Sequence, residues 1–308
     1  MKISYYPYDG INNKYIDIVI TILKEIADVE VLPFKVKDLL KIKSEVWNSD
    51  ILWLNWFENH YSIPNTFLKF IGLCLLRIKG VKIYFVFHNK TAHDGKFISK
   101  FSIRYMLFLS TKIIIHSKVS TRYLPKSQHK KCLYFPHPNY IDHYGKRIET
   151  NEVDKTNSLK LLFFGAIKPY KNIDLLIEIL NEIRDVELLI AGYYQDLSFK
   201  EYLVQQVKYD NIKFKFGFID DEEIPGLISD SDILIMPYDL TSSLNSGSVI
   251  LAFSYGRTVI CPKIATIEDM ESSNFYSYSY TDRESHKKEL KKQIQKAIAN
   301  NKIGRAHV

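Results

Sequence analysis

Short apolar runs rich in β-branched and aromatic residues alternate with longer segments of helical periodicity along most of the chain. Directly after one such run, for example, apolar residues recur at helical spacing: Ile173, Leu176, Ile177, Leu180 and Ile183. Continuous apolar strands that alternate with helices are typical of parallel sheets covered by helices on both faces. The alternation therefore predicts an α/β protein built on doubly wound parallel sheets.

The strand candidates form two groups, one in each half of the chain. The first group comprises Lys2–Tyr6, Val29–Leu32, Ile51–Leu54, Lys82–Phe87, Lys112–Ile115 and Cys132–Phe135. The second group comprises Lys160–Phe164, Glu187–Ala191, Lys213–Phe216, Ile233–Met236 and Thr258–Cys261. Between the strands the pattern predicts helices that include Asn12–Ala27, Asn65–Lys79, Lys171–Ile183, Glu222–Ser229 and Gly247–Tyr255.

One polar, aperiodic segment, Gly145–Ser158, interrupts the alternation. We therefore expect a first Rossmann-like domain over residues 1–145, a linker over 146–158 and a second Rossmann-like domain over 159–302. In doubly wound sheets, ligands bind outside the carboxyl ends of the strands. Two such domains that face each other would enclose a ligand in the cleft between them.

The end of the chain has an unusual sequence. A surface helix is predicted over Lys287–Asn300, and the final six residues, Ile303–Val308, have no helical period. These six residues are the translation of ATC-GGA-AGA-GCA-CAC-GTC, a string from a widely used sequencing adapter. We expect residues 303–308 to be a non-native tail and the natural chain to continue beyond about residue 302, although frayed natural termini are also common.

Composition and charge exclude several classes of protein. The three cysteines lie beside apolar residues, as reduced thiols of a cytoplasmic protein do, and no signal-peptide pattern precedes the first strand. Apolar runs such as Phe70–Leu76 are too short to cross a bilayer. A net charge of +7 attracts phosphates. Because the chain shows no recognisable nucleic-acid-binding motif, we expect no nucleic-acid partner.

Two lysines, Lys168 and Lys171, lie in the short loop between the strand that ends before Gly165 and the following helix. A helix N-terminus after a parallel strand is a common anion site, and glycine permits close approach of the backbone. The helix dipole disfavours isolated cations there but tolerates them beside a bound diphosphate. The alternative is an ordinary solvated loop.

A second loop with anion-binding character precedes the helix predicted at Gly247–Tyr255. Hydroxyl, amide and backbone N–H groups at a helix N-terminus suit phosphate or sugar hydroxyls, whereas one or two of them would be ordinary helix caps. The residues we assign to diphosphate binding in this loop are Ser243, Asn245, Ser246, Gly247 and Ser248.

Candidates for proton transfer and acceptor binding follow strand ends in the first half. His88 ends an apolar strand, and His93 and Asp94 lie in the next loop. Histidine is a suitable base near neutral pH, although a buried structural histidine is the alternative. On the acceptor side we place residues from two further strand ends: Asp9, Gly10, Asn12 and Glu58.

Three stretches taken together resemble the donor half of group 1 glycosyltransferases, which have the GT-B fold. They are "LLFFGAIKPYKNIDLLIEIL…VELLIAG", "FKFGFIDDEEIPGLISDSDILIMPY" and "NSGSVILAFSYGRTVICP". In addition, "VFHNKTAHD" is similar to a stretch of some bacterial polysaccharide transferases. The resemblance implies a glycosyltransferase that moves a sugar from a UDP- or GDP-sugar to a saccharide or lipid-linked acceptor in polysaccharide or glycoconjugate synthesis.

The resemblance also implies roles for single residues. Lys171 matches the lysine that contacts the nucleotide diphosphate, and Lys168 would substitute for an arginine because Ala166 stands at its position. The nucleobase side would be formed by Gly192, Phe216, Gly217 and Phe218. At the two positions where the family usually has glutamates, this chain has Ser243 and Leu251. This difference leaves open whether transfer retains or inverts the anomeric configuration.

We expect no metal ion and no cofactor besides the donor. Asp230–Asp232, "DSD", matches the metal motif of another transferase class but connects a helix to a buried strand. His137 and His143 are too scattered in the sequence to indicate a metal site. Lysines and helix N–H groups would take the place of Mg²⁺.

Two questions remain open at this level. The helices within Thr66–Gly80 and Lys96–Lys112 are basic and aromatic, so they either contact a membrane surface or lie buried with outward lysines. The same fold would also suit an inactive nucleotide-sugar-binding subunit or a sugar-nucleotide epimerase.

Overall fold

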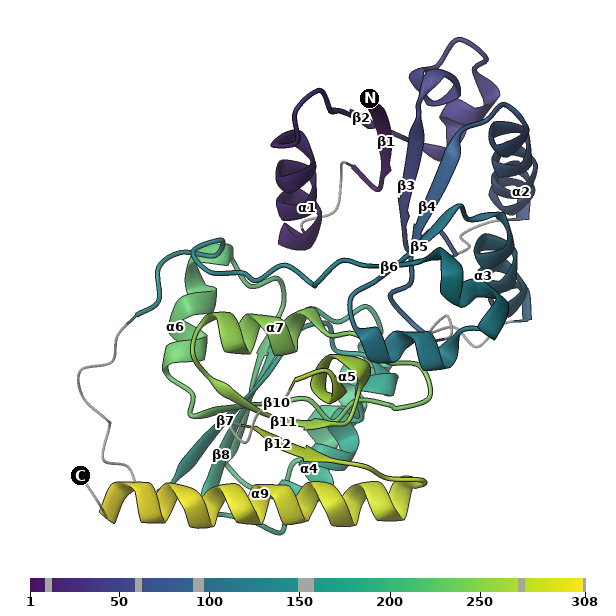
Figure 1. Ribbon diagram of the computed structural model, residues 1–308. Coiled ribbons are helices and arrows are strands. Elements are labelled where there is room, and N and C mark those ends of the chain that lie inside the picture. The colour runs from purple at the N-terminus through teal and green to yellow at the C-terminus, as the bar shows by residue number, and fades with distance from the viewer. Residues whose placement is uncertain (9–12, 59–62, 91–96, 149–157, 271–274, 307–308) are drawn as a thin grey trace. The chain divides into compact units, whose positions relative to one another are not determined.

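The computed structural model describes residues 1–8, 13–58, 63–90, 97–148, 158–270 and 275–306 (Figure 1). The chain divides into two compact units. Unit 1 comprises residues 1–138 together with 241–245, and unit 2 comprises 139–240 together with 246–308. Each unit contains one sheet with helices on its faces, and we describe each unit by itself.

The sheet of unit 1 has the order β2-β1-β3-β4-β5-β6, and all its pairings are parallel. The chain reverses its winding between β1 and β3, the switch point of this sheet. The strands are β1 (Lys2–Tyr6), β2 (Glu30–Pro33), β3 (Ile51–Asn55), β4 (Lys82–Val86), β5 (Lys112–Ile115) and β6 (Cys132–Tyr134). The helices are α1 (Lys14–Lys24), α2 (Ile63–Ile78) and α3 (Phe97–Leu109), with 3₁₀ turns η1 (Val36–Leu40), η2 (Glu45–Asn48), η3 (Lys118–Tyr123) and η4 (Lys126–Lys131).

The sheet of unit 2 has the order β12-β11-β10-β7-β8-β9 and is also parallel throughout. Its switch point lies between β7 and β10. The strands are β7 (Leu159–Phe164), β8 (Val186–Gly192), β9 (Ile212–Phe216), β10 (Ile233–Ile235), β11 (Thr258–Pro262) and β12 (Tyr276–Tyr278). The helices are α4 (Ile173–Leu180), α5 (Leu197–Gln206), α6 (Ile224–Ser229), α7 (Gly247–Ser254), α8 (Ala265–Glu268) and α9 (Arg283–Ala306), with 3₁₀ turns η5 (Pro169–Lys171) and η6 (Asp221–Glu223).

The core of unit 2 forms where alternate residues of β7 meet α4 and α9. Leu161 and Phe163 lie in one cluster of buried side chains with Leu176 of α4 and Leu290 of α9. The outer faces of α4 and α9 are polar and carry ion pairs such as Lys287 with Glu178. Exposed pairs of this kind contribute little stability, so burial of the apolar faces holds the two helices on the sheet.

Contacts along residues 139–148 explain why unit 2 begins at Asn139. The backbone N–H of Tyr140 donates to Ser254 Oγ over 2.9 Å, and Tyr255 Oη donates to the carbonyl of Gly145 over 2.7 Å. Ser229 Oγ donates to the carbonyl of Ile148 over 2.8 Å. These bonds attach the segment to α6 and α7, so residues 139–145 pack with the second sheet, although the sequence places them in the first domain.

Several segments differ from the sequence predictions. The helix predicted from Lys171 begins at Ile173, because Asn172 has a left-handed backbone with φ 51°. Helix α9 continues to Ala306, beyond the end predicted at Asn300. Helices α5 and α8 and the short strand β12 were not predicted. None of the helices in the described ranges is both long and apolar enough to cross a bilayer.

Candidate functional site

The loops that follow β7 and β10 lie next to each other at the switch point of the second sheet. The Asn172 side-chain amide donates to the carbonyl of Pro237 over 2.9 Å, and the backbone N–H of Asp239 donates to the carbonyl of Tyr170 over 3.2 Å. These two bonds join the lysine loop to the end of β10. The sequence therefore brings its two candidate anion loops to one place on the carboxyl edge of the sheet.

Lys171 lies half-buried on an aromatic ring in this loop. Its Nζ is 3.9 Å from the ring centroid of Tyr238 and 5.3 Å from that of Tyr170. Burial lowers the pKa of Lys171, whereas Tyr170 and Cys261 act to raise it. No carboxylate in the described part of the chain forms an ion pair with Lys171. Its charge is stabilised by the ring faces and is available to an anionic ligand.

The N-terminus of α7 lies beside the lysine loop. Ser246 Oγ accepts a bond from the backbone N–H of Val249 over 3.2 Å and lies 2.8 Å from Tyr238 Oη. Tyr238 therefore contacts both Lys171 and the helix cap. A Cβ on Gly165 would lie 3.3 Å from Ser248 Oγ, so the end of β7 is adjacent to the first turn of α7. This arrangement of lysine, hydroxyls and helix N–H groups suits a diphosphate.

Two glycines, Gly165 and Gly192, lie where the ends of β7 and β8 approach each other closely. A Cβ on Gly192, which has φ +151°, would lie 1.9 Å from the carbonyl oxygen of Gly165. The backbone N–H of Gly165 donates to the carbonyl of Ala191 over 3.0 Å, and that of Gly217 donates to the carbonyl of Gly192, also over 3.0 Å. Only glycine at position 192 permits the end of β8 to lie this close to the end of β7.

The residues predicted on the nucleobase side divide into two environments. The ring of Phe216 stacks on Phe214 at 4.7 Å and meets Tyr194 edge-on at 5.6 Å. Phe218, in contrast, is 61% exposed. Gly192, Phe216 and Gly217 therefore gather at the neighbouring ends of β8 and β9, while Phe218 is open to a ligand or to solvent.

Two residues predicted for the diphosphate, Ser243 and Asn245, belong to unit 1. Ser243 forms an antiparallel bridge with Asn89, and the Asn245 amide donates to the carbonyl of His88 over 3.5 Å. The backbone N–H of Lys90 also donates to the carbonyl of Ser242 over 3.1 Å. Ser246, Gly247 and Ser248 are thus the residues of this loop that lie with Lys171 in unit 2.

The carboxyl edge of the first sheet gathers neutral aromatic groups. His116 Nδ1 donates to the carbonyl of Phe135 over 2.7 Å, so its Nε2 accepts a bond from Tyr15 Oη over 2.8 Å. The Asn55 amide donates to the carbonyl of Tyr6 over 3.0 Å, which fixes its Oδ1 as the acceptor from His88 Nε2 at 3.1 Å. In this tautomer the lone pair of His88 is on Nδ1.

Burial keeps the histidines of this cluster uncharged. His88 stacks on Trp56 at 4.3 Å, and the rings of His116 and His137 lie 5.2 Å apart. Burial lowers the pKa of His116 to about 3 and that of His137 to about 4, and it holds the pKa of His88 well below 6.5. Sequence reasoning named His88 but not His116, although His116 also directly follows a buried strand.

Glu58 is the second titratable group near this edge. It is only 2% exposed, and its Oε2 has no hydrogen-bond partner in the described residues. Burial raises the pKa of Glu58 to about 7. The buried Lys69 donates to the carbonyl of Phe57 over 2.9 Å, and burial lowers its pKa to about 8. The remaining first-half candidates, Asp9, Gly10, Asn12, His93 and Asp94, lie outside the described residues.

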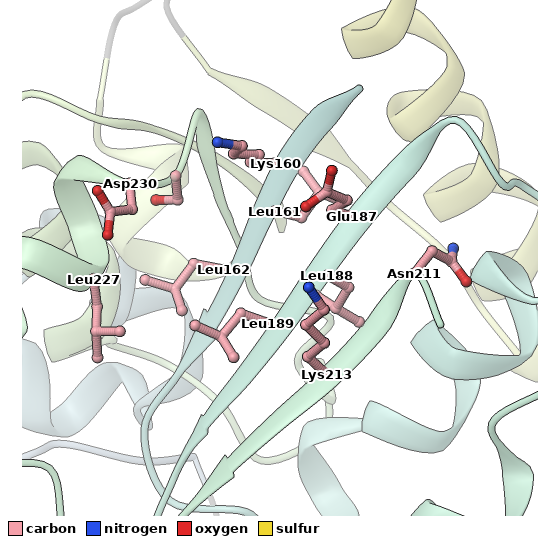
Figure 2. A pocket seen from close by; sticks show the side chains of 11 residues that line it. Lys160, Leu161, Leu162, Glu187, Leu188, Leu189, Asn211, Lys213, Leu227 and Asp230 are labelled. Atoms are coloured by element: carbon pink, nitrogen blue, oxygen red, sulfur yellow. The ribbon is translucent and has the colours of Figure 1, made fainter. Parts of the chain in front are cut away.

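The opposite, amino edge of the second sheet carries a different set of groups. A cavity of about 420 Å³ there is lined by charged side chains that include Lys160, Glu187, Lys213 and Asp230 (Figure 2). Asp232 accepts a bond from the backbone N–H of Lys160 over 2.8 Å, so the "DSD" segment ties β7 to β10 at this edge. Within the described ranges, no cluster of three or more histidine, cysteine, aspartate or glutamate residues could hold a metal ion.

A comparison with protein-family models identifies the family of this chain. The family model "Glycosyl transferases group 1" matches residues 146–306. A GDP-mannose:glycolipid 4-beta-D-mannosyltransferase of Xanthomonas campestris pv. campestris is 24% identical over 223 residues, which are 69% of this chain. The chain spans 61% of the length of that relative.

Two solved structures share the fold. Anabaena HepE, in complex with UDP and glucose, has a TM-score of 0.68 and 15% identity over 96% of this chain and 90% of its own. Sucrose-phosphate synthase of Thermosynechococcus elongatus has a TM-score of 0.61 and 14% identity over 92% of this chain and 81% of its own. Together with the two parallel sheets, these similarities confirm the fold predicted from the sequence, GT-B with doubly wound sheets.

Proposed function

Because the chain belongs to the group 1 glycosyltransferases, we propose that it transfers a hexose from a nucleoside diphosphate sugar to a saccharide or lipid-linked acceptor. The observation that carries this proposal is the arrangement at the second switch point. Lys171 lies on Tyr238, and Tyr238 contacts Ser246 at the N-terminus of α7. Cation, hydroxyl and helix N–H groups there are arranged as a diphosphate requires.

Transfer breaks the bond between the anomeric carbon and the diphosphate, so negative charge grows on the leaving phosphate. Lys171, Lys168 and the first N–H groups of α7 stabilise that charge. We propose that these groups act without a metal ion or a further cofactor. Gly192, Phe216 and Gly217 provide the nucleobase side of the same site.

We place the acceptor side in unit 1, together with the base that removes the acceptor proton if transfer inverts the anomeric configuration. His88 would accept the proton at Nδ1, and its low pKa keeps it neutral but weakly basic. Glu58 has a pKa of about 7, close to the value at which a general base works best near neutral pH. Among the described residues these two side chains are the candidates that mutagenesis must separate, and His93 and Asp94 stay candidates from the sequence.

The names of similar proteins suggest the donors and acceptor. The Xanthomonas relative is named for GDP-mannose and a glycolipid, and HepE is a complex with UDP and glucose. We propose that the donor here is a UDP- or GDP-sugar, that the acceptor is carried on a lipid, and that the protein acts in the cytoplasm at the inner face of the membrane. No nucleic acid takes part.

A screen of donors tests the proposal. Each UDP-sugar and GDP-sugar is mixed with the protein, and two quantities are measured: the shift in thermal midpoint and the release of UDP or GDP. We expect one donor to raise the midpoint and to be hydrolysed slowly without an acceptor. Stabilisation without any release or transfer would instead support an inactive binding subunit, and isomerisation of the donor sugar would support an epimerase.

A further inference from the structure

Helix α2 of unit 1 presents an apolar stripe to solvent. Phe67, Ile71, Leu75 and Ile78 are 63%, 58%, 48% and 82% exposed. Their spacing of four, four and three residues places them on one side of the helix. The opposite side of α2 is buried, for example at Leu73 and Leu76. The apolar outer stripe is therefore additional to the face that packs in the unit.

Helix α3 extends this stripe into a wider surface. The two helices pack side by side on the same side of the first sheet (Figure 1), with the rings of Phe70 and Tyr105 4.6 Å apart. Tyr105 Oη also donates to the carbonyl of Phe70 over 2.6 Å. On its outer side α3 exposes Phe101 by 50% and Phe108 by 72%. We call the six exposed side chains the α2–α3 surface: Phe67, Ile71, Leu75, Ile78, Phe101 and Phe108.

The charged residues of helices α2 and α3 are all basic. Neither helix contains an aspartate or a glutamate, and Arg77 and Arg104 are exposed on them. Lys131 donates to the carbonyl of Phe108 over 3.0 Å, which places a cation at one end of the surface. Burial lowers the pKa of Lys131, and the nearby charges of Arg77 and Lys130 lower it further, so these three cations lie close together.

We propose that the α2–α3 surface docks unit 1 on an anionic lipid bilayer. Aromatic and aliphatic side chains that project from two adjacent helices can enter the boundary between headgroups and acyl chains, while the surrounding cations attract anionic headgroups. Contact with a second copy through the same surface would instead bury Arg77 and Arg104 against two helices that contain no acidic residue to pair with them.

Docking of this kind would keep the protein where a lipid-linked acceptor is found. That consequence rests on the proposed function, but the binding itself does not and can be measured without transfer. Other group 1 members need not share this surface, because it depends on particular outward residues of α2 and α3 and not on the fold.

Flotation of the full chain with vesicles tests the proposal. The probes are vesicles of phosphatidylcholine alone and of phosphatidylcholine mixed with phosphatidylglycerol. We expect wild type to float with the anionic vesicles, to bind neutral vesicles more weakly and to be released in part by high salt. The double variant Ile71→Glu/Phe108→Glu should reduce partitioning at least about tenfold.

Matched variants in unit 2 provide the control. Leu197 and Val204 are exposed apolar residues of α5, so Leu197→Glu/Val204→Glu changes charge and exposed apolar area in a similar way. This control should partition like wild type, and all variants should keep the thermal midpoint and the UDP or GDP affinity of wild type. If wild type itself does not bind UDP or GDP, that result counts against the proposed function and not against the docking surface.

Three results would overturn the proposal. The first is wild type that stays in solution with anionic vesicles while it still binds nucleotide. The second is equal partitioning of the surface variant and wild type. The third is a dimer of wild type in solution that becomes monomeric in Ile71→Glu/Phe108→Glu, which would assign the surface to a second copy of the chain.

Discussion

The carboxyl edges of the two sheets have similar topology and opposite chemistry. In unit 2 the edge carries Lys168, Lys171 and the N-terminus of α7, all of which favour an anion. In unit 1 the corresponding edge carries buried aromatic rings and histidines that burial keeps neutral. The fold decides where loops converge, whereas the side chains on those loops make one edge cationic and the other neutral.

The largest expected effect concerns the backbone that supports the anion edge. Gly192→Ala would place a Cβ 1.9 Å from the carbonyl oxygen of Gly165. We expect the unfolding free energy of unit 2 to fall by about 3 kcal/mol or more and nucleotide binding to be lost. Urea unfolding followed by circular dichroism measures this change.

Gly226→Ala is the matched control for that substitution. A Cβ at Gly226, in α6, would meet no atom within 4 Å. The free energy of unfolding should remain the same or rise slightly, because alanine favours a helix over glycine. Equal losses in the two variants would show that the close approach of β8 to β7 is not the cause.

The second prediction uses the neutral histidines of unit 1. An unfolded histidine titrates near pH 6.5, whereas His88, His116 and His137 stay neutral to lower pH in the folded unit. Below pH 6.5 the unfolded chain therefore binds more protons, and stability falls as pH falls. Glu58, whose pKa is raised to about 7, has the opposite effect between about pH 7 and its unfolded value of 4.5.

Three histidines that lower stability at acidic pH and one glutamate that raises it leave a net effect of about two titrating groups. The unfolding free energy of unit 1 should therefore fall by up to about 3 kcal/mol per pH unit below pH 6.5. In unit 2, His286, with a pKa lowered to about 4, is the described histidine with a comparable shift. All three tryptophans of the chain, Trp47, Trp53 and Trp56, lie in unit 1. Urea midpoints from tryptophan fluorescence should therefore fall markedly between pH 7 and pH 5.5, and a constant midpoint would contradict the neutral cluster.

The third prediction separates the two candidate bases. If the product has inverted anomeric configuration by NMR, loss of the true base should lower the rate of transfer about a hundredfold while donor affinity survives. His88→Ala and Glu58→Gln are compared under saturating donor. The variant that keeps the wild-type rate excludes its residue as the base, and wild-type rates in both would exclude both residues.

The smallest expected effect is that of a chelator. Activity should persist in EDTA, since lysines and helix N–H groups take the electrostatic role of Mg²⁺ in the proposed mechanism. Asp232 at the amino edge is already bonded to the backbone of β7. Complete loss of activity on chelation, with recovery on addition of Mg²⁺ or Mn²⁺, would contradict this mechanism.

The sequence was informative where structure depends on local pattern. The strands of both sheets except β12 were predicted, because each long apolar run is bounded by polar or glycine residues. Strand β12 was not, because Tyr276–Tyr278 is short and not distinctly apolar, and α5 buries only Leu203. The break before α4 depends on the contact of Asn172 with Pro237, which is 65 residues away in the chain.

The site was predictable in part for the same reason. Lys171 could be found from its place between a strand end and a helix, and Gly192 from the resemblance to the family. The stacking of Lys171 on Tyr238, the separation of Ser243 and Asn245 from that lysine, and the cluster of His88 with His116 and His137 all arise from contacts between distant segments. Such contacts cannot be predicted from the local periodicity of the sequence.

Calorimetric titration with UDP and GDP tests the central claim, that the edge around Lys171 holds the diphosphate. Two variants, Lys171→Ala and Lys171→Met, remove the charge, and the second keeps most of the packing on Tyr238. Lys213→Ala, at the opposite edge of the same sheet, is the control. We predict a loss of about 1.5–3 kcal/mol of binding free energy, roughly tenfold to a hundredfold in Kd, for both Lys171 variants and none for the control. Unchanged affinity in the Lys171 variants, or an equal loss in Lys213→Ala, would contradict the assignment.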